Sequence, residues 1–260
     1  MKRHLLFSPL LATLLCASEY RLETGLATSS YDYRETDASG ILDTESSNFG
    51  DILGGYARLE VKLWDHDYDG SDALEVYGSH TEGETLYTGS ELGSGLPYGS
   101  STSYTENSFD DYQLNYIRCF DRGPGTFAFS GGIGYFEWQR SLSTVQIETY
   151  HWFYARLDSR VEYRFPNAVS IGFQLEGHYA IDAQMDAEMA ALSETFDLGD
   201  TYTFRGNIPL TIPISKGLAL IGRAEYEQTR IQHSNVIGGF YEPDSEQKNW
   251  HLYAGILFSY

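Results

Sequence analysis

The carboxyl-terminal stretch of this chain decides its fold class, and it reads Trp250-His251-Leu252-Tyr253-Ala254-Gly255-Ile256-Leu257-Phe258-Ser259-Tyr260. Counted back from the last residue, every second side chain is apolar or aromatic, whereas those between are more mixed. A period of two over this length predicts a β-strand with one apolar face and one tolerant face. The chain also ends on an aromatic residue, which is unusual for a soluble domain, because such termini are commonly polar and frayed.

This terminal strand resembles the closing strand of bacterial outer-membrane β-barrels, which commonly ends on an aromatic residue and acts as an assembly signal. The resemblance implies a transmembrane barrel in a Gram-negative outer membrane. It also implies recognition of the last strand by the barrel-assembly machinery. It implies nothing about a ligand or a reaction.

The amino terminus indicates export. A positive start at residues 2–4, an apolar run at 5–15 and a small-residue site at 16–18 predict a secretory signal peptide over residues 1–18. A lipidated Cys16 is the alternative, although the residues before it fit a lipobox poorly. Once the signal is removed, Cys119 is the only cysteine, so we expect no intramolecular disulfide.

Composition narrows the class of the remaining region, 19–260. It has no apolar run long enough for a spanning helix, and Tyr (21), Phe (14) and Gly (26) are abundant in the chain. The formal net charge of −20 argues against nucleic acid as a partner, because phosphate binding needs basic clusters. We therefore expect one all-β domain that binds no nucleic acid.

Turn signals divide this domain into ten candidate strands. Short connections alternate with long ones, which is the layout of an antiparallel up-and-down transmembrane β-barrel with both termini on the periplasmic side. A split or missed hairpin would make the count eight or twelve. The predicted strands lie near residues 20–33, 52–64, 72–81, 109–120, 125–138, 150–165, 168–181, 201–213, 217–230 and 250–260.

Alternation along the strands separates an apolar face from a charged face, as in 150–165 and 168–181. A soluble sandwich would show the same alternation. The signal peptide, the alternation of short and long connections, and the terminal Tyr260 indicate a membrane barrel instead. Aromatic side chains fall where headgroup belts are expected. The periplasmic belt comprises Tyr20, Phe120, Tyr163, Phe165, Phe258 and Tyr260, and the outer belt includes Tyr179, Tyr202 and Trp250.

The charged face of each strand should point into the lumen, where eight bases and eight acids nearly balance. A ten-strand barrel is narrow, so these charges should pair into a network that plugs it. A selective narrow channel lined by the same residues is the alternative. The candidate lumen network consists of Arg58, Glu60, Lys62, Arg156, Asp158, Arg160, Glu162, Arg164, Glu176, His178, Arg205, Arg223 and Glu225.

The five predicted long connections (32–51, 82–111, 139–149, 182–200 and 231–249) carry most of the net charge. They hold 22 of the 37 acidic residues, but only Arg34, Arg140 and Lys248 among the 17 bases. Solvated, mutually repelling surface loops are one interpretation. The other is recognition of a cationic partner, or divalent-cation bridging to lipopolysaccharide phosphates.

The turn Asp65-His66-Asp67-Tyr68-Asp69-Gly70 has the spacing of a calcium loop. Position twelve is Val76, where an EF-hand needs Glu, and no flanking helices are predicted. Asp65, Asp67 and Asp69 therefore form a candidate calcium-binding turn, and an ordinary Asp/Gly-rich hairpin is the alternative. We expect no other cofactor.

The ten-strand layout resembles that of the omptin proteases, and the segments 113–116 and 120–121 are similar to one omptin strand. This resemblance implies an Asp pair facing an Asp-x-His pair at the outer mouth. The nearest equivalents, Glu82-x-Glu84 and Glu176-x-His178, replace Asp by Glu. We therefore predict no catalytic residues and no enzyme.

The sequence thus predicts a monomeric outer-membrane barrel with a plugged lumen and a structural or surface-interaction role in contact with membrane lipid and lipopolysaccharide. A narrow passive porin for small solutes is the second hypothesis. An omptin-like surface hydrolase is the third.

Overall fold

The computed structural model describes residues 19–66, 70–90, 97–189 and 192–260, and within them the chain is entirely β-structure and turns. No helix in these ranges is long and apolar enough to cross a membrane. The strands are β1 (Tyr20–Asp37), β2 (Gly40–His66), β3 (Gly70–Gly89), β4 (Ser101–Arg122), β5 (Gly125–Ser143), β6 (Gln146–Arg164), β7 (Ser170–Met189), β8 (Leu192–Asp197), β9 (Thr201–Ser215), β10 (Leu218–Ile231) and β11 (Asp244–Ser259).

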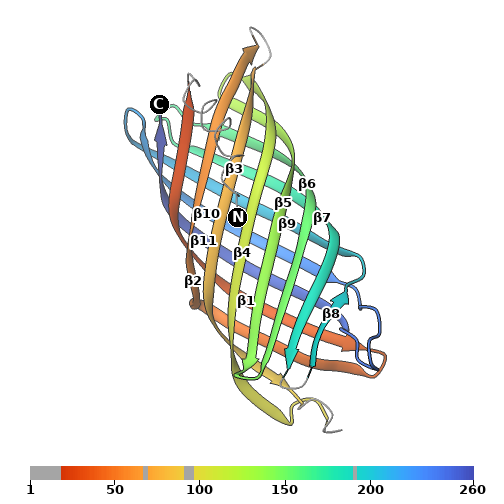
Figure 1. Ribbon diagram of the computed structural model, residues 1–260. Coiled ribbons are helices and arrows are strands. Elements are labelled where there is room, and N and C mark those ends of the chain that lie inside the picture. Colours follow the sequence, from red (N-terminus) through yellow and green to blue (C-terminus); the bar gives the residue numbers. More distant parts are fainter. Residues whose placement is uncertain (1–18, 67–69, 91–96, 190–191) are drawn as a thin grey trace, which may run out of the picture.

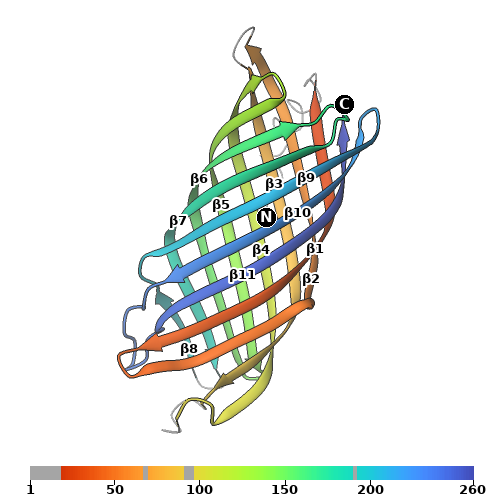
Figure 2. The ribbon, with the colours of Figure 1, turned by 180° about the vertical axis from the view of Figure 1, so that it is seen from behind.

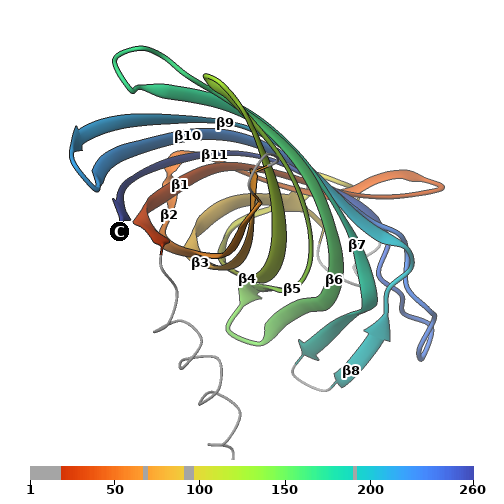
Figure 3. The ribbon, with the colours of Figure 1, turned by 90° about the horizontal axis from the view of Figure 1, so that it is seen from above.

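Ten of these strands form one closed antiparallel ring, and this confirms the predicted fold class (Figures 1 and 2). Neighbours in sequence are neighbours in the ring, except that β9 follows β7, and β1 pairs with β11 to close it. Seen from above, the end of β11 lies beside the start of β1 (Figure 3). The short β8 stays outside the ring and pairs only with the far end of β7.

The strands are much longer than predicted, and most of the predicted long loops are wrong. β1 and β2 remain paired as far as Asp37 and Gly40, and β5 and β6 as far as Ser143 and Gln146. Alternation persists there, but polar residues occupy both faces, so hydrophobic periodicity gives no signal. At the end away from the termini, the strands therefore continue beyond their predicted ends. This part of the barrel, formed by the described residues of the predicted long connections (32–51, 82–111, 139–149, 182–200 and 231–249), is here called the extension.

The exterior carries a broad apolar band. Outward-facing Leu26, Ile133, Phe153 and Leu157 are all more than half exposed, as lipid contact requires. The predicted belt residues also face outward, at the two edges of this band, and the rings of Tyr20 and Tyr260 stack with centroids 5.5 Å apart where β1 meets β11. Beyond the outer aromatic row most outward positions are polar, although Leu86 and Tyr104 are exposed there too, and this part of the wall is the extension.

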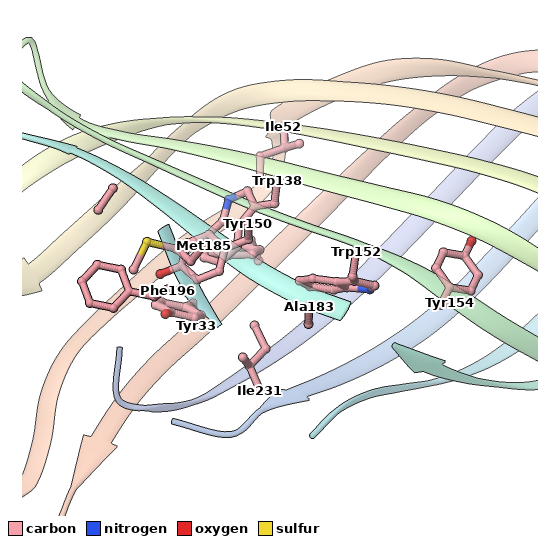
Figure 4. Packing of buried hydrophobic residues seen from close by; sticks show 12 residues of the cluster. Tyr33, Ile52, Trp138, Tyr150, Trp152, Tyr154, Ala183, Met185, Phe196 and Ile231 are labelled. Atoms are coloured by element: carbon pink, nitrogen blue, oxygen red, sulfur yellow. The ribbon is translucent and has the colours of Figure 1, made fainter. Parts of the chain in front are cut away.

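An aromatic cluster fills the interior of the extension (Figure 4). Trp138 stacks on Tyr150 with ring centroids 4.4 Å apart and meets Tyr33 edge-on at 5.1 Å. The strand β8 contributes Phe196, which packs beside Met185 of β7 and closes the side where β7 and β9 are no longer paired. The interior of a membrane barrel is expected to be polar. In the extension, however, apolar side chains occupy the inner face of the wall, whereas in the band they occupy the outer face.

Candidate functional site in the barrel lumen

Arg156 of β6 is the centre of the charged lumen. Its guanidinium lies 2.7 Å from Asp158 and 2.6 Å from Glu176, and it donates to Ser130 Oγ at 3.0 Å. Glu176 also contacts His178 at 2.5 Å, and both side chains are buried. Taking such charges out of water costs several kcal/mol per ion, so the paired arrangement is what permits their burial.

Arg205 of β9 joins this group to the opposite wall. It contacts Asp111 of β4 at 2.9 Å, Glu176 at 3.4 Å and Glu227 of β10. The hydroxyl of Tyr154 also donates to Asp111. Because these partners come from strands on different sides of the ring, their side chains cross the lumen and fill it.

A glycine makes room for one of these crossings. A Cβ at Gly134 would stand 2.2 Å from the Tyr154 ring, well inside contact distance. Tyr154 therefore lies flat against β5, where its other face stacks on His178 with centroids 4.2 Å apart.

Nearer the termini the pairing is looser. Arg58 lies 3.5 Å from Glu75, and Arg160 lies 3.8 Å from Glu60. Arg223 has no carboxylate within ion-pair distance among the described residues, and its guanidinium lies over the rings of Tyr253 (4.1 Å) and Tyr56 (5.2 Å) instead. Below this level a cavity of about 940 Å³ opens at the terminal end of the barrel, and Lys62, Glu162 and Arg164 line it together with Glu60 and Arg160.

The structure thus places all thirteen residues of the candidate network on the lumen side, but in two separate groups. Five line the cavity at the terminal end: Glu60, Lys62, Arg160, Glu162 and Arg164. The remaining eight lie deeper: Arg58, Arg156, Asp158, Glu176, His178, Arg205, Arg223 and Glu225. Asp111 also faces the lumen; its position was counted with the predicted connection 82–111, although the predicted strand 109–120 already contained it.

A second charged cluster, inside the extension, was placed wrongly by the sequence analysis. Arg140 was assigned to an exposed loop, yet its side chain is only 1% exposed. Its guanidinium contacts Glu45 at 2.6 Å, Glu35 at 2.8 Å, Glu148 at 3.0 Å and Asp43 at 3.3 Å. It also lies over the Tyr33 ring at 4.8 Å. One base is thus surrounded by four acids.

A fifth acid, Glu242, belongs to the same cluster. It enters from the segment between β10 and β11, and Tyr150 donates to it at 2.6 Å. Among the acids assigned to surface loops that the structure describes, six are buried and point inward: Glu35, Asp43, Glu45, Asp111, Glu148 and Glu242. The signal that could have identified them is parity, since Glu35 and Asp43 share the face of Tyr33 and Glu45 once β1 and β2 are extended.

The excess of acid in this cluster favours protonated carboxyls. Burial raises the pKa of Asp43 well above its usual range, and neighbouring Glu35 raises it further against the opposing effect of Arg140. Burial, Glu35 and Glu148 likewise raise the pKa of Glu242 well above its usual range. Burial also raises the pKa of Glu148. The carboxyls of this cluster therefore keep their protons to a higher pH than exposed carboxyls do.

The structure does not bring together the residues of the other candidate sites, which are the calcium turn and the two omptin-like pairs. Asp65 contacts Lys62 at 2.6 Å, whereas Asp67 and Asp69 of the predicted calcium turn lie outside the described residues. Glu82 and Glu84 are exposed on the outer surface of β3, while Glu176 and His178 are buried in the lumen. The barrel wall separates the two pairs, so they do not face each other across a groove.

Comparison with known proteins shows the fold. No protein-family model and no curated protein matches this sequence. Among solved structures, the outer membrane protease OmpT from Escherichia coli is similar, with a TM-score of 0.60, 10% identity, and coverage of 94% of this chain and 98% of OmpT. The fold is that of an outer-membrane β-barrel.

Two further similar structures are weaker matches. The transport unit of the autotransporter AIDA-I from Escherichia coli has a TM-score of 0.49 at 9% identity, covering 94% of this chain and 91% of that one. The translocator domain of the autotransporter NalP from Neisseria meningitidis has a TM-score of 0.43 at 11% identity, with 96% and 92% covered.

Proposed function

We propose that this protein is a monomeric outer-membrane barrel that does not conduct solutes and that presents its extension as an interaction surface outside the cell. Both termini would lie in the periplasm, and the barrel-assembly machinery would recognise the strand ending at Tyr260. Outer-membrane lipid and lipopolysaccharide would surround the apolar band.

The observation that carries this proposal is the filling of the lumen at two levels. In the band, Arg156 and Arg205 cross the lumen to their carboxylates. In the extension, Trp138 and Arg140 are fully buried within the ring. Between the two levels lies a small cavity of about 50 Å³, lined by Tyr31, Asp111 and Arg205 among others, which is room for a few water molecules.

Planar-bilayer conductance tests the proposal. Refolded protein should give no stable current steps, and its heat-dependent gel migration should show in parallel that the barrel has formed. Stable single-channel steps whose size changes in Arg156→Gln or Arg160→Gln would refute the closed lumen.

A narrow passive porin is the second candidate, because the 940 Å³ cavity at the terminal end reaches Glu60 and Arg160. A smaller cavity of about 30 Å³ lies beyond it, beside Arg58 and Glu23. A porin would need these spaces to join, so the conductance experiment separates the two candidates directly.

For the surface role, the outward residues of the extension supply the chemistry. Asp51, Glu82, Glu84 and Glu106 line one shallow groove without a basic residue. Such a surface favours a cationic partner or a divalent cation. We propose binding and not catalysis, since His178 is buried and held by Glu176, where an external substrate does not reach it. Hydrolysis of a peptide substrate that is lost in His178→Ala would contradict this.

A further inference from the structure

The short strand β8 leaves one strand edge unpaired. β7 and β9 pair only as far as Tyr179 and Tyr202, and beyond this point β8 continues the wall of the extension by pairing with the end of β7 (Figure 3). Along its other edge β8 pairs with no strand of the described chain. Such an edge presents backbone N–H and C=O groups in the geometry that another strand recognises.

Hydrogen bonds at the end of β8 show which backbone groups face this free edge. The C=O of Asp197 accepts from the N–H of Asn235, and the N–H of Asp197 donates to Asn235 Oδ1, both at 3.1 Å. The next residue, Leu198, donates in the opposite direction, to the C=O of Ala183 in β7. The backbone groups of Asp197 therefore point away from β7.

Thr195 and Ser193 share this orientation with Asp197. Because every second residue of a strand directs its backbone groups to the same side, the N–H and C=O of both residues point away from β7. Neither residue makes a hydrogen bond on that side to any residue that the structure describes. Their backbone donors and acceptors are available to a further strand, and Asn235 already occupies the adjoining position in the manner of one residue of such a strand.

Acidic side chains lie beside this free edge. Asp186 and Glu188 of β7 and Asp197 of β8 are all on the outer face, since the residues between them are buried. His151 contacts Asp186 at 3.2 Å, and even a protonated His151 would leave two of these three negative charges uncompensated.

The neighbouring parts of the chain supply no base for these acids. Residues 180–200 contain no Arg or Lys, and neither does the connection 232–243 that carries Asn235. On the far side of β9, Arg230 is held by Glu246 at 3.1 Å. The outer surface along the free edge is therefore negative and favours a cationic partner.

We propose that the free edge of β8, at Ser193 and Thr195, binds an extended basic peptide as an added strand. Backbone hydrogen bonds to the edge supply affinity, and alternate side chains of the peptide supply specificity. Its lysines or arginines lie on the outer face beside Asp186 and Glu188, and its apolar side chains lie on the inner face beside Phe196. The inference rests on the proposed surface role and names the chemistry of the partner.

A second copy of this chain is the poorer occupant of the same edge. Pairing β8 with β8 of another copy would bring Asp186, Glu188 and Asp197 of both copies together. Like charges facing each other across strands are destabilising.

The test measures fluorescence polarisation of a labelled peptide of alternating lysine and valine, titrated with refolded protein in detergent micelles. Thr195→Pro removes an N–H that faces away from β7, so the pairing of β7 with β8 is kept. It should weaken binding about tenfold, whereas Thr195→Val, which keeps the N–H, should change the Kd by less than about twofold. Equal loss in both variants would overturn the proposal, and heat-dependent gel migration shows whether each has formed a barrel.

A matched pair of charge variants tests the acidic surface. Asp186→Asn/Glu188→Gln should weaken binding several-fold and reduce its dependence on salt. Glu82→Gln/Glu84→Gln removes two exposed carboxylates from β3 and should leave the Kd unchanged. Equal weakening in both would show attraction to the whole acidic surface and would refute a site at β8.

Two modified peptides test the backbone pairing itself. The amides of a strand point alternately to its two edges, so N-methylation of either all lysine or all valine amides blocks one edge of the peptide. One of these peptides should lose binding and the other keep it, and equal affinities would overturn the proposal. A protein dimer that Thr195→Pro dissociates would assign the edge to a second copy instead. Failure to bind peptide by a barrel that does not conduct would refute this inference alone and leave the closed lumen standing.

Discussion

Replacing Arg140 by Met tests whether the buried cation holds the extension together. Methionine keeps much of the side-chain volume but removes the charge that four carboxylates share at 2.6–3.3 Å. Burial leaves these groups no access to water, so at least one carboxylate that is ionised beside Arg140 must take up a proton for the fold to persist. The cost of that proton depends on pH.

The magnitude follows from the pKa of an ordinary glutamate. Forcing one carboxyl with a pKa of about 4.3 to be protonated at pH 7.5 costs about 4 kcal/mol, and at pH 5.5 only about 1.6 kcal/mol. Loss of one partner from a buried ion pair commonly costs about 3–5 kcal/mol, which agrees with the higher value. We therefore expect a large, pH-dependent destabilisation of the extension.

The assay is urea-induced unfolding followed by tryptophan emission. In a Trp64→Phe/Trp250→Phe background only Trp138 and Trp152 remain, and both belong to the aromatic cluster. The reasoning fails if the loss in Arg140→Met is the same at pH 5.5 and 7.5, because lost packing has no such dependence. The control Arg230→Met removes an arginine whose side chain is 55% exposed and should cost less than about 1 kcal/mol.

Three other outcomes follow. The wild-type extension should be more stable at pH 5.5 than at pH 7.5. The pKa values of Asp43 and Glu242 are raised in the folded state, which therefore binds more protons than the unfolded state, and its stability falls as the pH rises through those values. A flat pH profile in the same emission assay would contradict this. Gly134→Ala should destabilise the barrel by roughly 1–3 kcal/mol in urea unfolding, since its Cβ would displace Tyr154, whereas an unchanged midpoint would show that the ring moves freely. Cys119 lines the cavity at the terminal end, so a membrane-impermeant maleimide should label it only after the outer membrane of cells is opened, and rapid labelling of intact cells would reverse the proposed orientation.

The membrane part of the fold was predictable because two signals coincide there. Lipid demands apolar side chains on one face, and the narrow lumen demands polar ones on the other, so the last strand alternates cleanly up to Tyr260. That alternation, together with the turn signals, the order of short and long connections and the terminal Tyr260, predicted the closed ten-strand ring and the side of the wall on which Arg156 and Glu176 lie.

The extension was not predictable by the same means. Outside the hydrocarbon, water accepts polar side chains on the outer face, while Arg140 makes polar partners acceptable on the inner face too. Glu45 and Glu148 then look like the residues of a solvated loop, although both are buried. Only the pairing of one strand with the next distinguishes the two situations, and a single sequence does not contain that information.

The Arg140 cluster also has a consequence for the order of assembly. Its acids come from β1, β2, β6 and the segment just before β11, so the first and last parts of the chain both contribute. Tyr33 near the start lies 3.5 Å from Glu242 near the end, across the seam that closes the ring. A barrel released before its last hairpin has joined would leave this group of charges incomplete and open to water. The cluster thereby makes completion of the ring, and not merely insertion of its strands, the step at which the extension becomes rigid.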